Sequence, residues 1–138
     1  MSFVMGNNKY ENICDLLKKS KRIMVVGLSK NPIKTSRNIA EYLKDNGYEV
    51  VGVNPTTSTI EGFEVYNSIA EVPGEVDIIN VFRRSEDIPE IMGEVMKKSP
   101  SALWLQLGIS NDEAVQPAID AGIFTVQNRC IKVEHQRC

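Results

Sequence analysis

The chain has 138 residues, which is the usual size of one domain. Its apolar content of 42% and charged content of 25% are ordinary for a globular protein, and its formal net charge of -2 gives no basis for binding nucleic acid. No apolar run approaches the roughly 20 residues that a membrane span needs, and the first 22 residues lack the features of a signal peptide. We therefore expect a cytoplasmic protein of one domain, without nucleic-acid or membrane partners.

The cysteines do not predict a metal site. Cys14, Cys130 and Cys138 have no C-x-x-C spacing, and the chain offers only one histidine, His135, beside them. An odd number of scattered cysteines is typical of reduced thiols in a cytoplasm. We expect Cys130 to be a small buried residue, and a mixed disulfide between it and a bound thiol cofactor stays an alternative.

Strands and helices alternate along the chain. A first amphipathic helix is expected from about Asn8 to Lys19, within an N-terminal segment of residues 1–21. A short extended piece and one helical turn after Ser68 precede the third strand. Five buried strands are expected because each is a short apolar run, mostly rich in β-branched residues; they are residues 22–27, 49–54, 76–82, 102–108 and 123–128.

The helices between these strands carry recognisable ends. Ser36 is expected to cap the helix after the first strand, and residues 85–99 form a helix with acids first and lysines last. Ser110 and Glu113 form a capping box for the next helix, which Pro117 should kink or shorten. The alternation predicts an α/β fold of the Rossmann-like three-layer αβα type, with an open, mainly parallel sheet of about five strands in the order 3-2-1-4-5.

The residues that follow the strands indicate the kind of ligand. In a parallel sheet, ligands bind beyond the carboxyl ends of the strands. None of the stretches there leads with an acid or a histidine; they are residues 27–37, 54–57, 83–84, 106–108 and 128–130. This favours an anionic ligand that bears phosphates. We find no carboxylate pair, no Cys–His couple and no Ser–His–Asp set at these positions, so catalysis is not expected.

The loop after the first strand has the character of an anion site. Gly27 allows the backbone to approach a ligand, and the start of the next helix presents free N–H groups and a partial positive charge. A dinucleotide site would need G-x-G-x-x-G and an acid after the second strand, but only Gly27 is present and Asn54 stands in the acid's place. The loop also lacks the G-K-S/T of a Walker motif.

Five segments together are specific: "VVGLSKNPIKTS", "VVGVNP", "DIINVFRRSEDIPEI", "LWLQLGISNDEA" and "NRCIKVEH". In these segments the chain resembles the single-domain coenzyme A-binding proteins of bacteria and archaea. It is also similar to the coenzyme A-binding module of the succinyl-CoA synthetase α-subunit. The resemblance covers about residues 22–134 and implies a Rossmann-like domain with coenzyme A across the strand ends. Thr35-Ser36 stands where the commonest family form has Pro-Ser.

The resemblance also implies which residues contact coenzyme A. The first loop would hold the pyrophosphate, the turn after the second strand the adenosine end, and the third strand end the nucleotide. The last two strand ends would face the pantetheine. The implied contacts are Gly27, Leu28, Ser29, Lys34, Ser36, Arg37, Asn54, Pro55, Val81, Phe82, Arg83, Gln106, Gly108 and Asn128.

The leading hypothesis is therefore the non-catalytic binding of coenzyme A or a short acyl-CoA. One alternative is the coenzyme A-binding subunit of a multi-component acyl-CoA synthetase, with its catalytic domains on a separate partner chain. A second alternative is an NAD-binding redox regulator, against which the missing glycines and the missing acid count. A protein partner and a homo-oligomer both stay open.

Overall fold

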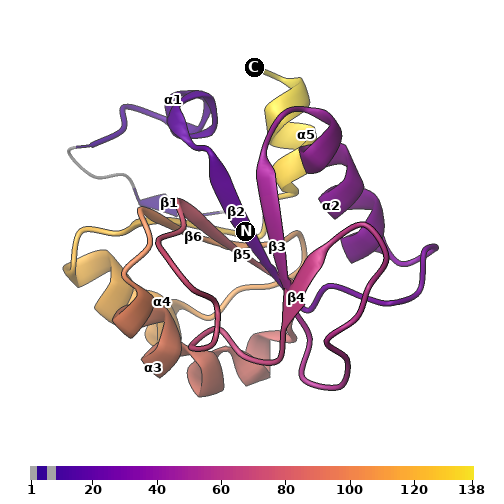
Figure 1. Cartoon of the computed structure of the whole chain (residues 1–138). Coiled ribbons are helices and arrows are strands. Elements are labelled where there is room, and N and C mark those ends of the chain that lie inside the picture. The colour runs from indigo at the N-terminus through magenta and orange to yellow at the C-terminus, as the bar shows by residue number, and fades with distance from the viewer. Residues whose placement is uncertain (1–2, 6–8) are drawn as a thin grey trace.

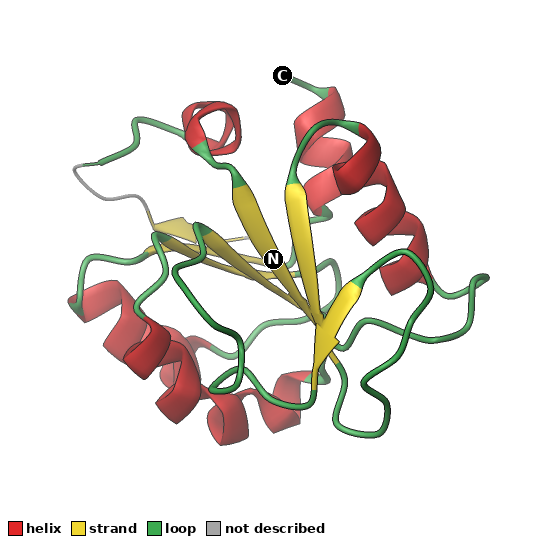
Figure 2. Cartoon of the chain, in the orientation of Figure 1, coloured by secondary structure: helices red, strands yellow, loops and turns green. Residues whose placement is uncertain are grey.

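The computed structural model describes residues 3–5 and 9–138, and it has one β-sheet between two layers of helices (Figures 1 and 2). The strands are β1 (Phe3–Met5), β2 (Arg22–Val26), β3 (Glu49–Val53), β4 (Glu64–Tyr66), β5 (Ile78–Val81), β6 (Ala102–Leu105) and β7 (Phe124–Gln127). The helices are α1 (Ile13–Lys19), α2 (Thr35–Asp45), α3 (Ile88–Lys98), α4 (Asp112–Asp120) and α5 (Ile131–Gln136), with a 3₁₀ turn at Ser85–Asp87. Within the described part of the chain, no helix combines the length and the apolarity needed to cross a bilayer.

The sheet confirms the predicted α/β class. Its order is β1-β7-β6-β5-β2-β3-β4, and every pair from β7 to β4 is parallel, while β1 is antiparallel to β7. The short piece 64–66, expected only to be extended, pairs with β3 as β4. The five predicted strands correspond to β2, β3, β5, β6 and β7, and they lie in the order 2-1-3-4-5. The predicted order 3-2-1-4-5 is therefore wrong: β5 pairs with β2, and β4 takes the place beside β3 where the third predicted strand was expected.

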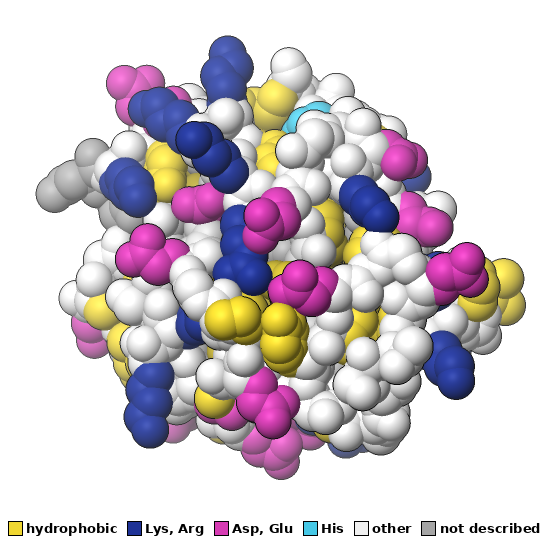
Figure 3. All heavy atoms as spheres, viewed as in Figure 1, with side chains coloured by type: hydrophobic (Ala, Val, Ile, Leu, Met, Phe, Trp, Pro, Cys, Tyr) yellow, Lys and Arg dark blue, Asp and Glu magenta, His cyan; other side chains and the backbone are white. Residues whose placement is uncertain are grey.

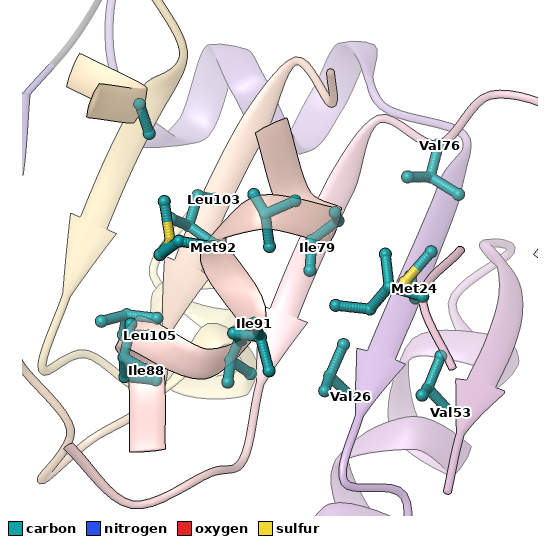
Figure 4. Packing of buried hydrophobic residues seen from close by; sticks show 14 of the residues in the cluster. Met24, Val26, Val53, Val76, Ile79, Ile88, Ile91, Met92, Leu103 and Leu105 are labelled. Atoms are coloured by element: carbon teal, nitrogen blue, oxygen red, sulfur yellow. The ribbon is translucent and has the colours of Figure 1, made fainter. Parts of the chain in front are cut away.

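Apolar side chains fill both faces of the sheet. Successive strand residues point to opposite faces, so Met24 and Val26 pack under α3 and α4, while Ile23 and Val25 pack under α1, α2 and α5. Figure 4 shows the first of these clusters, in which α3 lies over the sheet. Trp104 lies fully buried in the second cluster, as expected of a central strand. Because both faces are covered, the strands appear in the sequence as continuous apolar runs.

Several helix boundaries differ from the prediction. The predicted start of the first helix at Asn8 lies outside the described residues, and α1 begins after Asn12, whose side chain accepts a hydrogen bond from the N–H of Asp15. The chain after Ser68 forms a turn and no helix. In both places, individual hydrogen bonds determine where a short helix or turn begins and ends, and hydrophobic spacing does not encode these bonds.

The caps of α2 and α4 also differ. Lys34 occupies the cap position of α2, and Ser36 lies inside the first turn of that helix. Asn111, not Ser110, caps α4 by accepting a hydrogen bond from the N–H of Ala114 at 3.1 Å. Pro117 is accommodated within α4, which continues to Asp120.

The prediction of three reduced thiols is wrong for two of the cysteines. Cys14 of α1 and Cys138, beyond α5, form a disulfide with their Cα atoms 5.6 Å apart. The two helices pack against each other, and so bring together residues separated by 124 positions in sequence. Cysteine spacing alone does not reveal such a pairing. Cys130 is free and half-buried.

Candidate functional site

The turn after β2 lies where the ends of three strands meet. Gly27 has φ +91° there, and its N–H donates to the carbonyl oxygen of Val53, which ends β3, at 2.9 Å. A Cβ atom at this position would lie 2.7 Å from the carbonyl oxygen of Phe82, just after β5. The chain leaves β2 toward β3 on one side and returns to β5 on the other, so this turn marks the topological switch point. Only glycine fits both the backbone angle and the close approach.

Two hollows lie beside this turn, and Arg83 lines both. The Pro55 hollow, of about 80 Å³, is lined by Gly27, Pro55, Asn67 and Arg83, among others. The Gly108 hollow, of about 390 Å³, is lined by Phe82, Arg83, Arg84, Ser85, Glu86, Gly108 and Ile109. The guanidinium of Arg83 lies 3.9 Å from Asp87 and 3.8 Å from Glu90, so these carboxylates hold it only loosely.

The loop of residues 27–37 is hydrogen-bonded to the start of α2. The N–H of Ser29 donates to the hydroxyl of Ser36 at 2.9 Å, and the hydroxyl of Ser29 accepts from the N–H of Asn31 at 3.0 Å. Lys30 and Lys34 extend from the loop as exposed residues. The first N–H groups of a helix have no carbonyl partner within it, so the loop combines two cations with the positive end of α2.

Arg37 braces this loop from inside. Only 7% of the residue is exposed. Its guanidinium donates to the carbonyl oxygen of Lys30 at 3.0 Å, lies 3.8 Å from Glu41 and sits 5.6 Å from the ring centre of Phe63. The predicted phosphate contact is therefore a buried clamp that fixes the loop against α2.

Three predicted contacts use their side chains to shape neighbouring loops. Asn54 donates from its amide to the carbonyl oxygen of Leu28 at 2.9 Å, and its side-chain oxygen accepts from the N–H of Thr56 at 2.8 Å. The side-chain oxygen of Gln106 accepts from the N–H of Ile131 at 3.0 Å. These amides join strand ends that lie far apart in the sequence.

Asn128 has the same role on the last strand end. Its backbone has φ +58°, and its side-chain oxygen accepts from the N–H of Gly108 at 2.6 Å. Gly108 itself has φ +86°, and a Cβ atom there would meet no atom within 4 Å, so open space lies above it. Asn128 thus holds the Gly108 turn in a form that leaves its surface accessible.

The fourteen predicted contact residues therefore differ in where they lie and in what their side chains contact. Gly27, Pro55, Phe82, Arg83 and Gly108 line the two hollows. Ser29 and Lys34 lie in the loop, and Leu28 and Val81 are fully buried in the core. The side chains of the other five are used in hydrogen bonds within the protein: Ser36, Arg37, Asn54, Gln106 and Asn128.

Sequence reasoning missed some residues at this edge. Asn67 lines the Pro55 hollow and donates to the carbonyl oxygen of Asn54 at 2.9 Å. Ser85 lines the Gly108 hollow, and its hydroxyl accepts from the N–H of Ser110 at 3.0 Å. Asn67 follows the three-residue strand β4, and Ser85 follows a short irregular segment, so no periodic pattern marked them.

Asn80 is a third residue that the sequence did not single out. It lies in β5 between Val25 and Trp104 in register, and it is fully buried. Neither polar atom of its side chain has a hydrogen-bond partner among the described residues. A buried amide in that state costs free energy of folding.

On the face that Figure 3 draws, the charged side chains do not form one continuous field of a single sign. Figure 3 shows acidic and basic side chains interspersed over the face that it draws. At the rim of the Gly108 hollow, a hydrogen bond to Asp87 at 3.0 Å raises the pKa of Arg84 above its ordinary value. No group of three or more potential metal ligands occurs within residues 3–5 and 9–138. The attraction for an anion is therefore local to the loop and to Arg83.

The comparison with protein families settles the class. A family model described as a CoA binding domain matches residues 21–136. The chain belongs to the CoA-binding domain family. This CoA-binding domain has the parallel sheet and the glycine turn that the sequence segments around Gly27 and Asn54 predicted.

Three relatives illustrate the range of proteins that share the domain. YneT of Bacillus subtilis, an uncharacterized protein, is 40% identical over 131 residues, which are 95% of this chain and 97% of YneT. Acetate–CoA ligase (ADP-forming) II of Archaeoglobus fulgidus is 34% identical over 95 residues, which are 67% of this chain but 14% of the ligase. A solved structure of a hypothetical protein from Pyrococcus horikoshii is 31% identical with a TM-score of 0.87, covering 92% of this chain and 89% of that one.

Proposed function

We propose that this CoA-binding domain binds coenzyme A or a short acyl-CoA without catalysing a reaction on it. The observation that carries the proposal is the Gly27 turn, where three strand ends, the start of α2 and the two hollows come together in a member of this family. We also propose that residues 1–138 act as a single domain in the cytoplasm, as the sequence predicts.

The chemistry of the edge suits the parts of coenzyme A. The pyrophosphate would lie against the loop of residues 27–37, where Lys30, Lys34 and the first N–H groups of α2 offer positive charge. The adenosine end would lie at the Pro55 hollow, and the pantetheine arm would follow the Gly108 hollow past Phe82. Arg83, which lines both hollows, would contact the nucleotide between them.

Several of the implied contacts receive a different role in this proposal. Asn54, Gln106 and Asn128 would act as positioning residues, because their side chains already bond to the backbone. Ser36 and Arg37 would act in the same way on the loop. The absence of an acid after β3 still favours a ligand with a phosphate on its ribose, since a carboxylate there would repel it.

A ligand series tests the proposal. The thermal midpoint of the protein is measured with coenzyme A, dephospho-coenzyme A, NAD and ADP at matched concentrations. A ligand that binds only the folded state stabilises it by about 2.7 kcal/mol at a hundredfold excess over Kd. We expect a shift of several degrees with coenzyme A, a smaller one without the 3′-phosphate and none with NAD. No saturable binding of coenzyme A at millimolar concentration, or a shift with NAD alone, contradicts the proposal.

A pair of lysine variants tests the loop. Lys34→Ala removes a cation beside the expected pyrophosphate, and Lys97→Ala removes an equally exposed lysine at the far end of α3. A hydrogen bond to a charged group contributes about 1.5 to 3 kcal/mol. The Kd for coenzyme A should therefore rise roughly tenfold to 150-fold in Lys34→Ala and stay unchanged in Lys97→Ala. Equal affinities in both variants would remove the loop from the site.

The alignment with acetate–CoA ligase supports a second candidate function. In that case the domain would be the coenzyme A-binding subunit of a multi-component acyl-CoA synthetase. Co-purification with a catalytic chain, followed by ATP-dependent thioester formation in the mixture, would support it. Coenzyme A binding by the isolated chain with no such partner would favour the binding module.

A further inference from the structure

The disulfide between Cys14 and Cys138 lies on the surface, away from the strand ends of the candidate site. Both residues are exposed. They line a groove of about 710 Å³ between α1 and α5, together with Tyr48 and His135. Figure 1 shows the C-terminus above α5, on the side where α1 lies. The disulfide therefore lies at a groove that a small thiol can enter.

We infer that this disulfide is a reversible clasp that holds α5 and thereby regulates the coenzyme site. The regulation rests on the proposed function; the holding of α5 does not. An exposed disulfide is more readily reduced than a buried structural one and is of the labile, regulatory kind. Disulfides of cytosolic proteins are usually transient or redox-sensing, because glutathione and thioredoxin keep cytosolic thiols reduced.

The reaction is a thiol–disulfide exchange with a low-molecular-weight disulfide, RSSR. One cysteine thiolate attacks RSSR, forms a mixed disulfide and releases one RS⁻. The other cysteine thiolate then attacks the mixed disulfide, closes the Cys14–Cys138 bond and releases the second RS⁻. Two cysteines are oxidised and one RSSR is reduced to two thiols, and an excess of thiol reverses both steps.

Helix α5 needs support from outside itself. It has six residues, and isolated helices of that length are not stable in water. The helix is held to the rest of the protein by the buried side chain of its own Ile131. Two hydrogen bonds add to this, one between Tyr42 and His135 at 2.6 Å and one between Lys132 and Asn38 at 3.1 Å. The clasp adds a covalent tie at the far end of the same helix.

The near end of α5 belongs to the candidate site. The N–H of Ile131, the first residue of the helix, donates to Gln106, and the carbonyl oxygen of Arg129 accepts from the ring N–H of Trp104 at 2.8 Å. Asn128 holds the Gly108 turn, which lines the larger hollow. Helix α5 also contacts α2, whose start carries the expected phosphate loop. Loosening α5 therefore disturbs the site from two sides.

The experiment compares oxidised and reduced forms of the full chain. The protein is equilibrated at a series of ratios of oxidised to reduced glutathione, and alkylation followed by mass spectrometry gives the fraction of the Cys14–Cys138 disulfide. Hydrogen exchange of residues 128–136 and the Kd for coenzyme A are measured in each form. Cys14→Ser and Cys138→Ser each remove the clasp from one side, so the two variants control for each other.

We expect a reversible transition between the two forms. In the reduced form, exchange of residues 128–136 should rise at least about tenfold, and the thermal midpoint should fall by about 10 °C. If α5 stays docked in about a third of the reduced molecules, the Kd for coenzyme A rises about threefold. Cys14→Ser and Cys138→Ser should both match the reduced form in every buffer.

The outcomes separate the two proposals. Equal hydrogen exchange in the oxidised and reduced forms overturns the clasp. A clear difference in exchange with equal Kd values overturns its control of the site. If coenzyme A binds neither form, the proposed function fails, and the exchange measurement still decides whether the disulfide holds α5.

Discussion

Replacing Gly27 with alanine should destabilise the protein more than the same change at Gly47. Both glycines have nearly the same backbone angle, with φ +91° at Gly27 and +93° at Gly47. At Gly47 a Cβ atom would meet nothing within 4 Å, whereas at Gly27 it would lie 2.7 Å from the backbone oxygen of Phe82. Gly47→Ala is therefore a control that carries the backbone strain without the collision.

The expected magnitudes follow from these two terms. A residue with a Cβ atom in the left-handed region costs roughly 1 to 2 kcal/mol. Overpacking against atoms that cannot move costs roughly 1 to 3 kcal/mol more. The oxygen of Phe82 is such an atom, because it belongs to the backbone and the N–H of the same residue donates to Val26. The loss should be about 1 to 2 kcal/mol for Gly47→Ala and about 2 to 5 kcal/mol for Gly27→Ala.

Urea denaturation of the two variants and the parent measures the free energies of unfolding. The effect of alanine on the unfolded chain is common to both variants and cancels in their comparison. Equal losses, within about 0.5 kcal/mol, would refute the close contact between the β2 turn and the end of β5. The Kd for coenzyme A provides a second measurement. It should rise in Gly27→Ala and stay unchanged in Gly47→Ala, because Gly27 lines the Pro55 hollow and Gly47 does not.

Three further substitutions test other features. Gly52→Ala should lower the free energy of unfolding by about 1 to 3 kcal/mol, because its Cβ would overlap the side chain of Leu28; shortening that leucine to valine should recover part of the loss, and an unchanged urea midpoint in Gly52→Ala would contradict the packing. Asn80→Leu should raise stability by about 1 kcal/mol in the same assay, since it removes a buried amide without a partner, and a loss would reveal a bond that the amide makes. A hydrogen bond from the backbone N–H of Glu11, together with a neighbouring lysine, lowers the pKa of Asp15 below its ordinary value of 3.8. This stabilisation is present above pH 3.8 and is lost as the pH falls through the folded pKa. Asp15→Asn should therefore lower the thermal midpoint at pH 7 and make progressively less difference below pH 3.8. A difference that stays constant with pH would show that Asp15 does not titrate in this way.

The sequence predicted the sheet because buried parallel strands have a strong signal. Runs such as residues 22–27 and 102–108 are apolar on both faces, which few other structures require. The three-residue strands β1 and β4 carry too few residues for any period to appear. Their pairing depends on neighbours that the fold supplies.

The predicted site residues lie at the carboxyl ends of the parallel strands, but the sequence did not predict the hydrogen bonds of their side chains. Asn54 and Gln106 are polar residues at strand ends, which is why they stood out. Their hydrogen bonds reach Leu28 and Ile131, 26 and 25 positions away. A single sequence shows that such a side chain is polar, and it does not show whether its partner is the protein or a ligand. The Cys14–Cys138 bond was missed for the same reason.

The two outer strands determine whether strands of other molecules can pair with the edges of this sheet. An unpaired strand edge offers its N–H and carbonyl groups to other molecules and promotes aggregation. At one edge stands β4, which is only three residues long and begins with Glu64, a residue that ion-pairs with Arg22. At the other edge, β1 pairs along β7 and covers its outer side. Loss of the first five residues would uncover a strand whose side chains are all buried. The three residues of β1 therefore keep the β7 edge from recruiting strands of other chains.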